Sequence, residues 1–114
     1  MNIVPEDAVG FQAWLTENEA CEPARTWAEG KTLPEVWSQC ESGDWLMWLL
    51  NKAGYTWNLV TWNEYIRIIT PVWDEYEHVC ALTMAEYKRI CANTTRLLIP
   101  YPFGAKKKYN NESN

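Results

Sequence analysis

The sequence predicts an all-α fold, a compact bundle of five to seven short helices around a central tryptophan-rich helix at about residues 45–53. Three threonines, Thr32, Thr61 and Thr83, are each followed three residues later by glutamate, which is the capping-box pattern of helix starts. Apolar residues recur at helical spacing in several segments. No segment alternates polar and apolar residues for long enough to predict a strand, and the nearest candidate, residues 55–61, is short. We expect one helical domain over residues 1–104.

The first helix is expected at about residues 5–17, because Pro5 suits a first turn and apolar residues follow it at helical spacing. Its predicted apolar face consists of Val4, Ala8, Phe11 and Leu15, with Trp14 beside them. Two shorter helices are expected at about 23–29 and 33–41. Gly30 and Gly43 follow these helices and suit the left-handed conformation of a C-cap.

The fourth helix, residues 45–53, is predicted to start after Asp44 as its N-cap and to end at Gly54. It contains the apolar run from Trp45 to Leu50, which is apolar on every face for two turns. A helix of that kind is typical of a position surrounded by other helices. We therefore expect it at the centre of the core.

From residue 62 onward one apolar stripe continues across Pro71, although proline removes a backbone donor. Either the helix kinks at this proline, or Thr70 caps a second helix. The stripe is predicted to be Trp62, Tyr65, Ile66, Ile69, Trp73, Tyr76 and Cys80.

The last helix is expected at about residues 84–99, ending before Pro100. Its predicted buried positions are Met84, Tyr87, Ile90 or Cys91, Thr94 and Leu98. Residues 105–114 carry three adjacent lysines and few apolar residues, and are predicted to be a disordered tail.

Eight tryptophans in 114 residues indicate a large core for a small chain, since each buried indole removes roughly 150–250 Å² from water. The rings are expected to pack inward. Eight rings also exceed what a domain of this size usually hides, and tryptophan is enriched at binding hot spots. Trp27 and Trp57 fall outside the long apolar stripes and are predicted to be partly exposed.

The net charge of the chain is −5, and without Lys106, Lys107 and Lys108 the remainder sums to −8. An acidic surface repels nucleic acid, because affinity for phosphate depends on cationic side chains. It suits a partner protein with a basic surface, whose encounter it accelerates. The alternative interpretation is a solvated acidic exterior that only keeps the protein soluble.

The N-terminus lacks a basic segment followed by an apolar one, and no run of residues approaches the length of a membrane span. The sequence therefore predicts a cytoplasmic protein with no membrane contact. The four cysteines are then expected to be reduced and, at apolar helix positions, buried like small hydrophobic residues. No closely spaced cysteine pair points to zinc, and no metal or other cofactor is predicted.

No catalytic motif is present: glycine-rich phosphate loops, nucleophile elbows and zinc-protease motifs are all missing. His78 and Cys80, two residues apart on a helix, lie on different faces and form no nucleophilic pair. Asp74, Glu75 and Glu77 follow Trp73 and resemble paired carboxylates, but a solvated helix flank explains them better than an active site. We expect a protein that is not an enzyme.

The segment from Cys40 to Leu49, with the pattern C-x-x-G-D-W-x-x-W-L, is followed by Ile69-Thr70-Pro71-Val72-Trp73-Asp74-Glu75-Tyr76. Together they resemble a group of small helical bacterial and phage proteins described as immunity-protein-like, over about residues 33–80. The resemblance implies a protein that binds and neutralises another protein, either a toxin or, in a phage, a host defence nuclease. It assigns no binding residues.

The leading hypothesis is a small acidic protein that binds and inhibits a partner with a basic surface, a nuclease or nucleic-acid-binding complex, as a phage anti-defence (anti-CRISPR-like) or immunity protein would. One alternative is an assembly protein that self-associates through exposed tryptophans, and another is a small metal protein or enzyme. The predicted partner-binding residues are Glu17, Glu19, Glu22, Trp27, Glu29, Trp57, Asp74, Glu75 and Glu77.

Overall fold

The computed structural model describes residues 3–80 and 82–103. Over these ranges the chain is helical and contains no strand, which confirms the predicted all-α class. The elements are α1 (Ala8–Glu17), α2 (Glu22–Ala28), α3 (Leu33–Gln39), α4 (Gly43–Lys52), α5 (Leu59–Asp74), the π-helical turn η1 (Glu75–Val79) and α6 (Met84–Leu98). The predicted domain boundary at residue 104 and the predicted tail, 105–114, lie outside the described residues.

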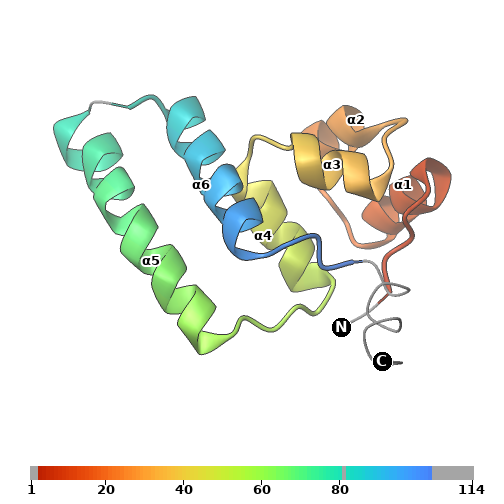
Figure 1. Ribbon diagram of the computed structural model, residues 1–114. Helices are drawn as coiled ribbons and strands as arrows, with labels where there is room; N and C mark the ends of the chain where they lie inside the picture. The colour runs from red at the N-terminus through yellow and green to blue at the C-terminus, as the bar shows by residue number, and fades with distance from the viewer. Residues whose placement is uncertain (1–2, 81, 104–114) are drawn as a thin grey trace.

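The helices form a slab with principal extents of 46 × 37 × 19 Å. Figure 1 shows α5 along one edge, α6 next to it, then α4, and the three short helices α1, α2 and α3 grouped at the opposite side. The closest packing joins α4 to α6 and α5 to α6. The helix α4 therefore lies near the middle, as predicted, and shares that position with α6.

The larger of two hydrophobic clusters lies between α4 and the N-terminal helices. Phe11 of α1, Leu33 of α3 and both Leu46 and Leu50 of α4 are almost fully buried in it. Burying such side chains stabilises the fold by about 1.5–3 kcal/mol each. This cluster also receives Ile99 and Phe103, so the segment after α6 returns to the N-terminal half of the molecule.

A much smaller cluster holds α5 against α6. Its buried members are Tyr65 and Ile69 of α5 and Cys91 of α6. The long edge helix is thus held by few fully buried residues.

Polar contacts join segments that are distant in the sequence. The guanidinium of Arg96 on α6 donates from Nη1 to the carbonyl oxygens of Trp37 and Cys40, at 2.9 and 2.6 Å. These carbonyls lie at the C-terminus of α3, where a helix leaves acceptors without partners. The hydroxyl of Tyr101 donates to the carboxylate of Glu6, near the start of the chain.

Two of the three predicted capping boxes are present. Thr32 and Thr83 each accept the N–H of the glutamate three residues later, and that carboxylate accepts the threonine N–H in return. The third prediction is wrong, because α5 begins earlier: the side chain of Asn58 accepts from the N–H groups of Val60 and Thr61. Asp44 is likewise not the cap of α4, since the hydroxyl of Ser42 accepts from Trp45 N–H.

The three glycines predicted at helix ends, Gly30, Gly43 and Gly54, have different structural roles. Gly30 has a φ angle of +79°, in the left-handed region as predicted, and Gly54, where the fourth helix was predicted to end, has a φ of +80°. Gly43 is not a C-cap. It is the first residue of α4, and a Cβ there would lie 2.4 Å from Cys91 Cβ, so its missing side chain permits the close approach of α6.

The helix α5 continues through Pro71 to Asp74, so the alternative in which Thr70 caps a second helix is wrong. The Thr70 hydroxyl instead donates to Ile66 O at 2.6 Å, within the same helix. The wider turn η1 follows, and Cys80 ends it with a φ of 59°. No helix among the described residues combines the length and apolar character that a membrane crossing requires.

Candidate functional site

A row of apolar side chains on α5 faces solvent, and we call it the α5 stripe. It consists of Leu59, Trp62, Ile66 and Trp73, whose exposed fractions are 72%, 38%, 42% and 43%. At 100° per residue these four positions fall within an arc of about 60° on the helix. Large apolar residues that gather on one exposed face are typical of an interaction site.

The stripe is exposed because α5 has more apolar surface than α6 covers. Tyr65 and Ile69 point to α6 and are buried, and the stripe lies on the adjoining flank of the same helix. This corrects the sequence prediction, in which one stripe was expected to pack inward. Of its seven members only Tyr65 and Ile69 are buried, while Trp62, Ile66, Trp73 and Cys80 are exposed.

Aromatic neighbours fix the two indoles of the stripe. Trp62 packs edge-on against Trp57 with ring centroids 5.1 Å apart, and it stacks on Tyr65 at 5.7 Å. At the other end Trp73 contacts Tyr87 of α6 at 5.3 Å. Rings held in this way lose little conformational entropy when a partner covers them, which favours binding.

The C-terminal end of the stripe is acidic. Asp74, Glu75 and Glu77 follow Trp73 directly, and all three are exposed. The only base beside them on this element is His78, whose Nδ1 lies 3.1 Å from the Asp74 carboxylate and forms an ion pair only when protonated. This end therefore attracts cationic groups.

Other polar groups near the stripe add little net charge. Glu64 and Arg67 on α5 form an exposed ion pair, and this contact lowers the pKa of the Glu64 carboxyl. Burial raises the pKa of the Tyr65 and Tyr87 hydroxyls, so both phenols are neutral at physiological pH. The charge at the stripe is thus concentrated in the acids of η1 and the end of α5.

The residues predicted to bind a partner do not form one patch. Asp74, Glu75 and Glu77 lie at the end of the stripe, and Trp57 supports it through Trp62. The remaining predicted residues belong to α1, α2 and the segments that flank them, on the opposite side of the slab (Figure 1): Glu17, Glu19, Glu22, Trp27 and Glu29.

The tryptophans are less buried than predicted. Among the eight indoles only Trp37, with an exposed fraction of 5%, is buried. Trp27 and Trp57 are partly exposed, as predicted, but the two most exposed rings are Trp62 and Trp73. Sequence reasoning placed both in the core. The sequence signal that could have indicated their exposure was the width of the apolar arc of α5, which is wider than the face that one neighbouring helix covers.

The cysteines divide into two classes. Cys40 and Cys91 are buried as predicted, whereas Cys21 and Cys80 are exposed, contrary to the prediction. None of the four forms a disulfide. Within residues 3–80 and 82–103 no three histidine, cysteine or acidic side chains gather closely enough to hold a metal ion. Met84, predicted to be buried, is half exposed.

Comparison with known proteins gives no further assignment: no family model, no curated protein sequence and no solved structure matches the chain.

Proposed function

We propose that this protein acts without catalysis, by binding a partner protein through the α5 stripe, and that it inhibits a nucleic-acid-binding protein by covering a basic surface. The observation that carries the proposal is the α5 stripe itself. Two anchored indoles and an isoleucine are exposed on an edge helix whose main helical neighbour is α6. Phage anti-defence (anti-CRISPR-like) and immunity proteins are the class of inhibitor that the sequence resemblance implies.

The stripe has the composition of an energetic hot spot. Tryptophan is the residue most enriched at such positions, and truncation of a hot-spot residue costs about 2 kcal/mol or more. Trp62 and Trp73 are the two indoles of the stripe and Ile66 lies between them in the sequence. A complementary partner element is an amphipathic helix with apolar residues at every third or fourth position.

Charge selects which amphipathic helix fits. Asp74, Glu75 and Glu77 at the end of the stripe attract a helix with lysine or arginine near its apolar face. The overall negative charge of the chain also speeds the encounter with a basic protein at low salt. Nucleic-acid-binding proteins carry such basic surfaces, because phosphate recognition requires them.

A second candidate function, self-association, is favoured by the exposure of Trp62 and Trp73. If two copies met along antiparallel α5 helices, the acidic end of each stripe would face the uncharged residues Asn58, Leu59 and Val60 of the other. Such a contact gains nothing from the acids, so we favour a basic partner. Light scattering at micromolar concentration separates the two: we expect a monomer, and a dimer that Ile66→Ser dissociates would support self-association instead.

The binding proposal is tested with a synthetic amphipathic helix that carries leucine on one face and lysine on the other. We expect this peptide to bind the wild-type protein, and to bind the Ile66→Ser/Trp73→Ser variant about tenfold more weakly or worse. The control is Val9→Ser/Leu97→Ser, which removes two even more exposed apolar residues from α1 and α6 and should leave the affinity unchanged. Equal affinity for a peptide with glutamate in place of lysine would contradict the electrostatic part.

The natural partner is then sought by affinity capture from lysate with the same variants. A partner that fits the proposal is basic, binds nucleic acid, is retained by the wild type and the Val9→Ser/Leu97→Ser control, and is lost with Ile66→Ser/Trp73→Ser. Its nucleic-acid binding should fall when the wild-type protein is added. A captured protein that is retained equally by all variants would contradict the assignment to α5.

A further inference from the structure

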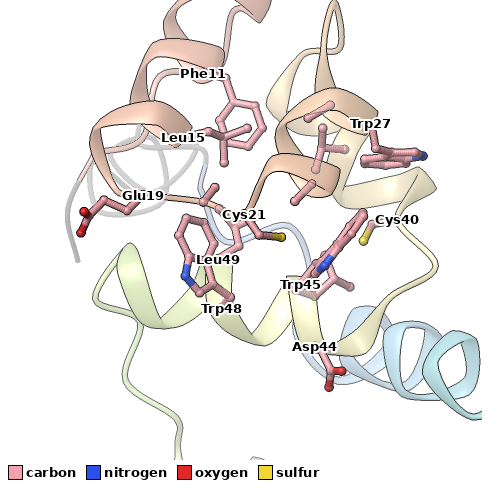
Figure 2. A pocket seen from close by; sticks show the side chains of 15 residues that line it. Phe11, Leu15, Glu19, Cys21, Trp27, Cys40, Asp44, Trp45, Trp48 and Leu49 are labelled. Atoms are coloured by element: carbon pink, nitrogen blue, oxygen red, sulfur yellow. The ribbon is translucent and has the colours of Figure 1, made fainter. Parts of the chain in front are cut away.

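A cavity of about 360 Å³ lies on the opposite side of the slab from α5, between α4 and the short N-terminal helices. Figure 2 shows Phe11 and Leu15 of α1 on one side of it and Trp45, Trp48 and Leu49 of α4 on another. Its volume falls in the range of small-molecule sites, about 300–1,000 Å³. Protein interiors otherwise contain few voids larger than a water molecule.

Small residues on one wall and large rigid ones on the other keep the cavity open. Three of the lining side chains at and near α2 are alanines, namely Ala20, Ala24 and Ala28. The facing indoles are held by other rings, Trp48 by Trp14 at 5.9 Å and Trp45 by Trp27 at 6.0 Å. The walls therefore do not close by a simple change of rotamer, and a ligand that fills the space restores the missing van der Waals contacts.

The charged side chains that line the cavity are acids, and the cations near the lining are already engaged, Arg25 with Ala20 O, Arg96 with Cys40 O and Lys88 beside Asp44. The two lining acids are Glu19 and Asp44. Figure 2 shows them at opposite margins with their carboxylates directed outward. Asp44 has Lys88 at 3.7 Å, and the Asp44 side chain stays largely exposed. The margin thus carries two carboxylates, one of them beside Lys88, while the interior is made of indole, aliphatic and thiol groups.

Indoles also attract cations through their π faces. Trp27 already has such a neighbour, since Lys31 Nζ lies 4.7 Å from its ring centroid and donates to Trp27 O. Within residues 3–80 and 82–103, no lysine or arginine lies over the ring of Trp45, which lines the cavity with Trp27 and Asp44. An ammonium at the mouth beside Trp45 would thus lie near the π face of this ring and near Asp44.

We propose that this cavity binds a small organic cation, with an aromatic or branched apolar body inside the cavity and an ammonium group at the margin that carries the carboxylates. The site is separate from the α5 stripe, so it does not depend on the proposed partner. Cys21 lines the cavity and is exposed, and its thiol reports on occupancy. Cys80 is also exposed but lies at the end of η1, far along the chain from the cavity, and serves as an internal control.

The test compares three congeners that share one apolar body: 4-phenylbutylammonium, 4-phenylbutanol and 4-phenylbutanoate. By calorimetry at low salt we expect the ammonium to bind about fivefold tighter than the alcohol or better, and the carboxylate to bind weakest. The ammonium should slow alkylation of Cys21 and leave alkylation of Cys80 unchanged, read by peptide mass spectrometry. Failure of the ammonium to bind, or equal slowing at both thiols, would overturn the proposal.

Variants assign the effect to the cavity and to its margin. Ala24→Trp fills the space and should abolish binding, whereas Ala85→Trp adds the same ring on α6 outside the cavity and should not. Glu19→Asn/Asp44→Asn should reduce the preference for the ammonium over the alcohol, with Glu22→Gln as the control at a neighbouring acid outside the lining. Equal affinities of alcohol and ammonium for the wild type would refute the choice of a cation.

Discussion

Side chains at the helix starts carry much of the local order of this protein. Thr32 and Glu35 form one reciprocal pair, with Thr32 N–H donating to Glu35 Oε1 at 2.9 Å, and Thr83 and Glu86 form another at the same distance. These hydrogen bonds favour the charged form of each carboxylate and hold the pKa of Glu35 and Glu86 below the ordinary value of 4.5. Both pairs were readable from the sequence, because a capping box uses residues only three positions apart.

The capping carboxylates predict how stability depends on pH. A group whose pKa is lower in the folded state stabilises the fold fully above its unfolded pKa, and this contribution is lost as pH falls through the folded pKa. We expect Glu35→Gln/Glu86→Gln to flatten the fall in unfolding free energy below pH 4.5, measured by urea titration. Glu41→Gln, an exposed acid outside these caps, is the control. An unchanged slope in the double variant would contradict the role of the caps.

The cysteines give a second prediction at the residue scale. Cys21 and Cys80 are exposed, whereas Cys40 and Cys91 are buried. Burial also raises the pKa of the Cys40 thiol, which lowers its thiolate fraction. In the native protein without ligand, iodoacetamide should modify Cys21 and Cys80 within minutes and the other two only after unfolding. Peptide mass spectrometry checks this, and rapid native labelling of Cys40 would contradict the packing of the α3–α4 junction.

At the scale of the elements, α4 approaches α6 closely at Gly43. A Cβ there would meet not only Cys91 Cβ but also the backbone, at 3.2 Å from Ala92 N. Backbone atoms cannot rotate away as a flexible side chain can, so the two helices must separate to admit a methyl group. Gly30, by contrast, has open space around it and a left-handed φ of +79°.

We expect Gly43→Ala to lower the free energy of unfolding by about 2 kcal/mol through overpacking. Gly30→Ala meets only the left-handed backbone penalty of about 1 kcal/mol. Urea denaturation of both variants compares the two effects directly. A cost for Gly43→Ala no larger than that for Gly30→Ala would show that the α4–α6 contact is looser than described.

Much of the element pattern was predictable, and the errors have physical causes. Apolar spacing and capping residues predicted that the helices exist. At two helix starts, however, the N-cap is a residue earlier in the sequence than the predicted one: Ser42 instead of Asp44, and Asn58 instead of Thr61. The conformation of Gly43 depends on α6, about fifty residues later, which no local pattern contains. In the same way the spacing on α5 predicted an apolar face but not the number of helices available to cover it.

The candidate site was only partly predictable, because the sequence does not show which helices cover the apolar face of α5. The acids Asp74, Glu75 and Glu77 were singled out because they cluster in the sequence. Trp62 and Trp73 were assigned to the core because their spacing is typical of a buried face. A period of 3.6 residues identifies which side chains share a face, whereas exposure is decided by the arrangement of other elements. Trp57 was identified as partly exposed because it lies outside every stripe.

At the scale of the whole molecule, the slab shape explains why two different surfaces remain available. With an extent of 19 Å in its thinnest direction, the fold has little depth in which to bury eight indoles. The radius of gyration is 15.2 Å, against about 13 Å expected for a compact domain of this length. Apolar side chains gather at an accessible surface both in the α5 stripe at one edge and in the cavity beside α4 at the other.

The eight indole N–H groups allow a direct test of which surface a protein partner covers. The measurement is an NMR titration of the tryptophan-labelled protein with the lysine-bearing amphipathic helix, and then with a captured partner, each signal being assigned by a Trp→Phe variant. We predict that the signals of Trp62 and Trp73 shift or broaden while those of Trp27 and Trp45, at the cavity, stay in place. Movement of the Trp27 and Trp45 signals with Trp62 and Trp73 unchanged would contradict binding through α5.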